Sequence, residues 1–173
     1  MALQKNPLLT EKVVDMLLEQ LKNNFNNYCS DIDNYYSDGI SLEKIDENAY
    51  YITNQYEPLR MPSIFVLFED HAFQYSRDPN YLESSDSCIV VVTSEDVGAA
   101  TLTRKMWRYG RVLYSCLNLV DLVSGDGRLK LKVIPNRLGY TQPITEKLKE
   151  RGRKFRMDAV LELTIQHYEK FLI

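Results

Sequence analysis

The sequence contains no hydrophobic run long enough to cross a membrane. Its longest strongly apolar run is the short stretch from Cys88 to Val92, whereas a membrane-spanning helix needs about 18 or more residues. The first residues, Met-Ala-Leu-Gln-Lys-Asn-Pro, also lack the apolar segment of a secretory signal peptide. We therefore expect the protein to remain in the compartment in which it is made.

Cysteine and histidine are scarce as well. The chain has three cysteines, Cys29, Cys88 and Cys116, and two histidines, His71 and His167. An odd number of cysteines without a Cys-x-x-Cys pair argues against a disulfide framework and indicates a reducing compartment. Cys88 and Cys116 fall in apolar patterns, which predicts buried, unreactive thiols. Because the two histidines are far apart in the chain, a zinc site of cysteines and histidines is not expected.

The common catalytic and nucleotide-binding motifs are also missing. The sequence has no P-loop, GxGxxG, GxSxG or HExxH pattern. Glu69, Asp70 and His71 place two carboxylates beside an imidazole, but without a second ligand group in view this trio is interpreted as a solvated strand end. His167 is interpreted as a hydrogen-bonded histidine at a sheet edge. We therefore predict no catalytic residue, no cofactor and no metal, and an enzyme acting through the trio is the least favoured alternative.

What the sequence does contain is typical of a globular protein. Hydrophobic residues make up 45% and charged residues 26% of 173 residues, which suits a single domain spanning residues 1–173. A first amphipathic helix is predicted from Glu11 to about Ser30, with the apolar stripe Val14, Leu18, Leu21, Phe25 and Tyr28. A second helix is predicted to run to a turn at residues 124–127. It should bury Leu102, Met106, Tyr109, Leu113 and Cys116 and expose Arg104, Arg108 and Arg111.

The remaining apolar segments have the length and alternation of strands. Strands are predicted near residues 50–53, 63–69, 87–93 and 129–133, and a last one, from Phe155 to His167, is unusually long. Residues 30–48 are interpreted as a polar connector, and residues 70–86 and 135–152 as long loop or hairpin excursions. Since helices do not regularly separate the strands, we predict an α+β fold. It is a mostly antiparallel sheet with two long amphipathic helices packed on one face.

Charge is distributed unevenly along the chain. Residues 1–100 carry 6 Lys/Arg against 17 Asp/Glu, whereas residues 101–173 carry 15 against 7. The densest cationic run lies near the end of the chain and comprises Lys147, Lys149, Arg151, Arg153, Lys154 and Arg156. Such a run could be a solvated face, could pair with acidic surface of the same or a neighbouring subunit, or could lie near DNA. The sequence leaves these uses open.

The order of these elements resembles the tail-terminator and tail-completion family of long-tailed bacteriophages. The similarity rests on an N-terminal amphipathic helix at 11–28 and the strand Pro62-Ser-Ile-Phe-Val-Leu-Phe. It continues with the strand Cys88-Ile-Val-Val-Val-Thr-Ser-Glu-Asp96, a helix containing Arg108-Tyr109-Gly110-Arg111, and a terminal alternating strand from Phe155 to Tyr168. Gly110 stands where the family would be expected to carry a small residue such as alanine.

The resemblance implies a structural virion protein without catalysis or cofactor. It implies a homo-oligomeric ring, a hexamer, which ends the tail tube at its head-proximal end and is assembled in the host cytoplasm. The partners so implied are other copies of the chain, the major tail tube protein and neck or head-completion proteins. DNA would pass close by without sequence recognition, and no membrane is involved. Another neck protein (a stopper or adaptor) and a small nucleic-acid-binding protein remain as alternatives.

A ring made from one chain needs two different complementary patches on each subunit. We expect the cationic run at 147–156 to meet acidic surface of a neighbour or to face the channel. Exposed ion pairs contribute little stability, so apolar contacts must supply most of it. Phe73, Tyr140 and Ile144 in the long excursions are the residues expected to make those contacts.

Overall fold

The computed structural model describes residues 9–52, 60–74, 81–148 and 152–170, with side chains except at 9–10, 73–74, 81–82, 146–148 and 152–153. Its helices are α1 (Leu9–Tyr36) and α2 (Ala99–Leu117). Its strands are β1 (Tyr50–Tyr51), β2 (Ser63–Gln74), β3 (Tyr81–Asp96), β4 (Asp121–Val123), β5 (Leu129–Tyr140), β6 (Ile144–Leu148) and β7 (Gly152–Lys170). The α+β class predicted from the sequence is confirmed.

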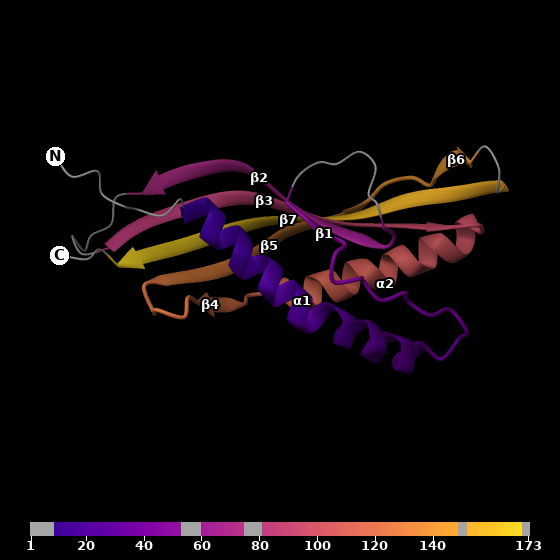
Figure 1. The fold of residues 1–173 in the computed structure, drawn as a ribbon, viewed down its shortest axis with the longest axis horizontal. Coiled ribbons are helices and arrows are strands. Elements are labelled where there is room, and N and C mark those ends of the chain that lie inside the picture. Colours follow the sequence, from indigo (N-terminus) through magenta and orange to yellow (C-terminus); the bar gives the residue numbers. More distant parts are fainter. Residues whose placement is uncertain (1–8, 53–59, 75–80, 149–151, 171–173) are drawn as a thin grey trace.

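The strands form one seven-stranded sheet in the order β1-β2-β3-β7-β5-β4, and β6 also pairs with β7. Every pairing is antiparallel except that of β1 with β2. The long strands run along the longest axis of the molecule, with both helices on one face of the sheet (Figure 1). The terminal strand is confirmed as the longest one. It lies between β3 and β5, so it is the centre of the sheet rather than an edge.

The helix α1 buries a row of side chains that advances by four residues at each step. Leu21 and Phe25 of the predicted stripe are fully buried, whereas Val14 and Leu18 are half-buried and Tyr28 is exposed. The buried row is completed by Val13, Leu17 and Cys29. A four-residue row is inclined to the helix axis and is the ridge by which helices pack at an angle. The predicted stripe followed the axis instead, which explains the shift.

The helix α2 buries the predicted face, with Leu102, Met106, Tyr109, Leu113 and Cys116 at most 1% exposed. Tyr109 also donates a hydrogen bond to the Glu43 carbonyl, at 2.7 Å. Arg104 and Arg111 are exposed as predicted. The expected exposure of Arg108 is wrong, because its side chain is only 6% exposed. The helix ends at Leu117, and residues 124–127 form the turn between β4 and β5 rather than the end of the helix.

The predicted polar connector at 30–48 is largely structured. The helix α1 continues to Tyr36, and the following segment sends Leu42, Ile45 and Ala49 into the core. Asn26 holds this segment against α1, because its side chain donates to the Ile45 carbonyl and accepts from the Ile45 amide. Three apolar residues spaced among acidic ones carry no regular period, so the sequence pattern could not identify them as core.

The two long excursions are mostly strands. In the first excursion, β2 reaches Gln74 and pairs with β3, which starts at Tyr81; residues 75–80 lie outside the described residues. In the second excursion, β5 continues to Tyr140 and β6 folds back on β7. Their polar composition gave no apolar alternation to indicate strands, but backbone pairing with neighbouring strands holds them extended. The hairpin interpretation of 70–86 is confirmed, and the loop interpretation is wrong.

All three cysteines are buried and free. Burial raises the pKa of the Cys29, Cys88 and Cys116 thiols to about 12, so each stays protonated and unreactive near neutral pH. The prediction for Cys88 and Cys116 is confirmed. Neither described helix combines the length and the apolar content that a membrane span requires.

Candidate assembly surface

The face of the sheet opposite the helices has an apolar centre. Along β3, Cys88, Val90 and Val92 point toward the helices and are buried, so the alternating residues Ile89 and Val91 point to the other face. Both are half-buried, and none of the described helices covers them. On the same face, Ile89 lies opposite Leu67 of β2, and Val91 lies opposite Val160 of β7. We call Leu67, Ile89, Val91 and Val160 the open-face patch.

Polar and charged side chains surround the open-face patch. Glu162 lies beside it on β7 and forms an exposed ion pair with Arg137 of β5, at 3.8 Å. Asn136 donates a hydrogen bond to the Thr164 hydroxyl at 2.8 Å, and Asp158 accepts one from the Thr93 hydroxyl. An apolar centre with a polar rim is the usual composition of a protein–protein contact surface.

The predicted cationic run lies at the opposite end of β7 from the C-terminus. Lys147 of β6 pairs across strands with Arg153 of β7, and the side chains of both lie outside the described residues, as do Lys149 and Arg151 entirely. Lys154 forms an ion pair with Glu95 of β3 in the same chain. Arg156 donates a hydrogen bond to the Thr93 hydroxyl at 3.1 Å. Within this run, the described cations are therefore engaged inside the subunit.

The predicted apolar interface residues have different surroundings. Ile144 is 62% exposed at the start of β6 and suits a contact with another molecule. Tyr140, which is 38% exposed, lies against Gly110 of α2, where an added Cβ would be 2.5 Å from its hydroxyl oxygen. Phe73 pairs with Ser84 in the β2–β3 hairpin, and its side chain lies outside the described residues. Tyr140 thus has a packing role within the chain.

The acidic front and basic back of the chain meet inside the subunit at several places. Lys105 of α2 lies 2.8 Å from Asp96 and 3.2 Å from Glu43. Burial opposes the ionised form of Asp96, but the hydrogen bond from Lys105 outweighs it and lowers the pKa of that carboxyl. Lys154 pairs with Glu95 in the same way. Pairing within one subunit, one of the uses that the sequence left open, therefore accounts for part of the asymmetry.

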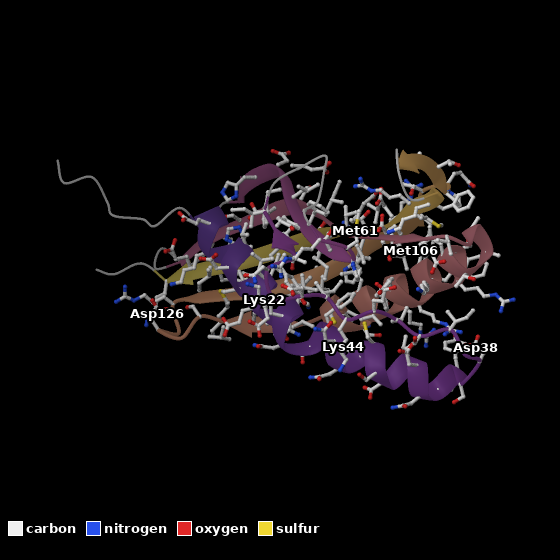
Figure 2. All side chains as sticks on the ribbon, turned by 45° about the vertical axis from the view of Figure 1, so that its right-hand side comes forward. Lys22, Asp38, Lys44, Met61, Met106 and Asp126 are labelled. Atoms are coloured by element: carbon white, nitrogen blue, oxygen red, sulfur yellow. The ribbon has the colours of Figure 1, made fainter. Side chains whose placement is uncertain are left out.

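Arg108 is buried because the segment after α1 folds over it. Its guanidinium donates to the Ile40 carbonyl and to the Asp38 carboxylate, and it lies over the Tyr36 ring, 4.4 Å from the centroid. The hydrogen bond from Arg108 lowers the pKa of Asp38. Figure 2 shows Asp38 at the end of the molecule remote from Asp126. A helical pattern cannot reveal a loop that returns from 68 residues away, which is why the sequence placed Arg108 in solvent.

The solvent side of α2 carries an exposed aromatic and cationic patch. Trp107, the single tryptophan of the chain, is 56% exposed, and Tyr114 is 42% exposed. Arg104 and Arg111 lie on the same face at helical spacing. Trp107 and both arginines also line a pocket of about 280 Å³ with Tyr36 and Arg108. Trp107 is not among the residues predicted from the sequence, although a tryptophan among arginines on the polar face of a helix is a visible signal.

We call Arg104, Trp107, Arg111 and Tyr114 the α2 patch. Because α2 lies on one face of the sheet and the open-face patch on the other, the two patches are on opposite sides of the molecule. They also differ in chemistry, one being aliphatic and the other aromatic and cationic.

The two histidines, expected to be isolated, meet in the structure. His71 and His167 lie with ring centroids 5.5 Å apart, on either side of Asp86. The interpretation of His71 as part of a solvated strand end is wrong, whereas its neighbours Glu69 and Asp70 are exposed as expected. No local signal marked Asp86, because hairpin register alone brings it opposite His71.

No protein-family model and no curated protein matches the chain. Among solved structures, a chain from the virion of a native gene transfer agent particle is similar over 93% of this chain and 99% of its own length. The two are 13% identical, with a TM-score of 0.43. A structural similarity at this level does not establish a common fold. The function is therefore inferred from the surfaces of this chain.

Proposed function

We propose that this protein is a structural subunit of a phage virion that self-assembles into a closed ring. The observation that carries the proposal is the presence of two unlike patches, the open-face patch and the α2 patch, on opposite sides of one subunit. A contact between unlike patches is heterologous, and repetition of such a contact closes a ring when the rotation between neighbours divides a full turn. The proposed role is structural and involves no catalysis.

The composition of the patches suits this contact. Tryptophan, tyrosine and arginine are the residues that most often dominate binding energy at protein interfaces, and Trp107, Tyr114, Arg104 and Arg111 gather on α2. The open-face patch offers an aliphatic, half-buried surface on which such side chains can pack. Charged side chains on the rim, such as Glu162 and Arg137, which pair within the subunit, would set the register of the contact rather than its strength.

The number of subunits in the ring and its place in the virion are proposed from the resemblance of the sequence to the phage tail-terminator family. We propose that six copies form a ring that ends the tail tube at its head-proximal end, with the major tail tube protein on one side and neck proteins on the other. The cationic residues Lys147, Lys149, Arg151 and Arg153 are assigned to the neighbour contact or to the channel wall. There they would attract DNA phosphates without reading the sequence.

Substitutions in each patch test this proposal. Trp107→Ala should remove the main aromatic contact, and Ile89→Lys should place a charge in the aliphatic patch. Val123→Ala, at a 57% exposed apolar residue of the edge strand β4, serves as the control. Native mass spectrometry at high protein concentration would report the oligomer, and binding to the ends of tail tubes from the same phage would report the capping activity.

We expect the wild type and Val123→Ala to form hexamers or to cap tubes, and both patch variants to stay folded monomers with at least about tenfold weaker capping. A wild type that neither assembles nor binds tube ends would contradict the proposal. Binding to head-completion proteins but not to tubes would instead favour a neck connector.

A further inference from the structure

Three neighbouring strands bring a histidine, an aspartate and a second histidine together. His71 of β2 lies directly opposite Asp86 of β3, and His167 of β7 lies opposite Ser84, two residues from Asp86 on the same face of β3. The cluster lies toward the end of the sheet where β2 ends and β3 begins (Figure 1). One nitrogen or oxygen atom from each of the three side chains lies within 4.8 Å of the other two.

This cluster is buried and incompletely hydrogen-bonded. The side chains of Asp86 and His167 are 0% exposed, and that of His71 is 25% exposed. His71 Nδ1 contacts Asp86 Oδ1. None of the described residues gives a hydrogen bond to Asp86 Oδ2, to either ring nitrogen of His167, or to the adjacent Ser84 hydroxyl. Buried polar atoms in native proteins nearly always have a partner, so these atoms indicate a ligand.

We propose that His71, Asp86 and His167 form a binding site for one Zn²⁺ ion that ties β2, β3 and β7 together. Two imidazoles and one carboxylate are a donor set that suits zinc. His167 Nε2 lies 3.4 Å from Asp86 Oδ2, which is the separation of about 3.4 Å expected for two ligands on one tetrahedral ion at about 2.0–2.1 Å.

The fourth ligand of a tetrahedral ion would come from solvent. The side chain of His71 is 25% exposed, so a water molecule can complete the donor set.

The proposal gives the ion a structural role that is independent of ring formation. The β2–β3 hairpin extends beyond the apolar part of the sheet, where polar residues such as Ser84 and Asp86 replace the aliphatic side chains of the core. An ion bound by all three strands would fix this hairpin on β7. The proposed site is thus a structural metal site that stabilises the β2–β3 hairpin rather than a catalytic centre.

The experiment uses the full chain without a histidine tag, because its two histidines then both lie in the site. Metal-free protein is titrated with Zn²⁺ by calorimetry, with Co²⁺ by visible absorption, and with Mg²⁺ as a hard cation that prefers oxygen ligands. We expect one equivalent of Zn²⁺ to bind per chain and to raise the melting temperature, Co²⁺ to give the absorption bands of a tetrahedral site, and Mg²⁺ to do neither.

His71→Gln and His167→Gln should each weaken Zn²⁺ binding at least about tenfold. Because His71 is partly exposed, metal-free His71→Gln should keep the far-UV circular dichroism spectrum of the wild type, which separates lost binding from lost folding. Asp70→Asn, at an exposed carboxylate next to His71, is the matched control and should bind as the wild type does. The proposal is overturned if the wild type binds neither Zn²⁺ nor Co²⁺ stoichiometrically, or if both histidine variants bind with unchanged affinity.

Discussion

Among the described glycines, Gly110 of α2 is the one at which an added Cβ would come closest to a neighbour, the side chain of Tyr140 in β5. A Cβ added at Gly110 would lie 2.5 Å from the Tyr140 hydroxyl oxygen and 2.9 Å from its Cε1 atom, distances that real Cβ atoms do not reach. The glycine in the middle of α2 therefore serves the packing of a tyrosine from the far end of β5. Its cost in helix propensity is about 1 kcal/mol relative to alanine.

This contact predicts opposite effects of one substitution in two backgrounds. In the wild type, Gly110→Ala should displace the Tyr140 ring and lower the free energy of unfolding by about 1 kcal/mol, because overpacking costs more than the helix gains. In a Tyr140→Ala background, the same change should raise it by about 1 kcal/mol, because only the helix propensity remains. Urea unfolding of the four proteins measures both values. The same sign in both backgrounds would contradict the packing explanation.

At the scale of elements, β7 holds the sheet together. It pairs with β3 on one side and with β5 and β6 on the other. The side chains of Met157, Ala159, Leu161, Leu163 and Ile165 face the helices and are buried. Strict alternation along a strand of 19 residues fixes which face is core, since a shift of one residue would exchange the two faces.

Substitutions at neighbouring positions of β7 should therefore differ in effect. Leu161 is fully buried. Leu161→Ala should therefore lower the free energy of unfolding by about 2–5 kcal/mol. Glu162 lies on the open face, so Glu162→Ala should change the free energy of unfolding by less than about 0.5 kcal/mol. Chemical denaturation monitored by circular dichroism measures the difference. An equal effect of the two changes would show that the facing of β7 is misassigned.

At the scale of the whole molecule, hydrogen-bonded and ion-paired carboxylates should make the stability of the protein depend on pH in the acidic range. The hydrogen bond from Ser124 lowers the pKa of Asp126 to about 2, and that from Arg108 lowers the pKa of Asp38. Three further carboxyls also have lowered pKa values, Asp46, Asp86 and Asp96. Glu169 acts in the opposite direction, because burial raises its pKa.

A lowered pKa in the folded state means that the unfolded chain binds protons more readily. Its contribution to stability is complete above the unfolded pKa of about 3.9 and is lost as the pH falls through the folded value. The melting temperature should thus change little from about pH 7 to pH 5 and fall between about pH 4 and pH 2. Asp126→Asn should reduce this acid dependence. A melting temperature that stays constant down to about pH 2 would refute the assignment.

The fold class, the facing of β7 and the buried row of α2 could be predicted from the sequence alone. The period-two alternation of residues 155–167 and the 3–4 spacing from Leu102 to Cys116 each record which side of an element lies in the core. The buried environments of Cys88 and Cys116 followed from the same kind of apolar pattern. These features are local, because each depends on side chains that repeat along a single helix or strand.

Contacts between elements that are far apart in the sequence could not be predicted from these patterns, because they depend on the tertiary structure. The burial of Arg108 depends on a loop that returns from Asp38 and Ile40, and the meeting of His71 with His167 depends on the register of three strands. The opposite placement of the two patches depends on helices that cover only one face of the sheet. A repeat along the chain fixes which face is buried, but not which distant partner lies against it. Contacts between polar groups far apart in sequence therefore arise only when the elements pack together.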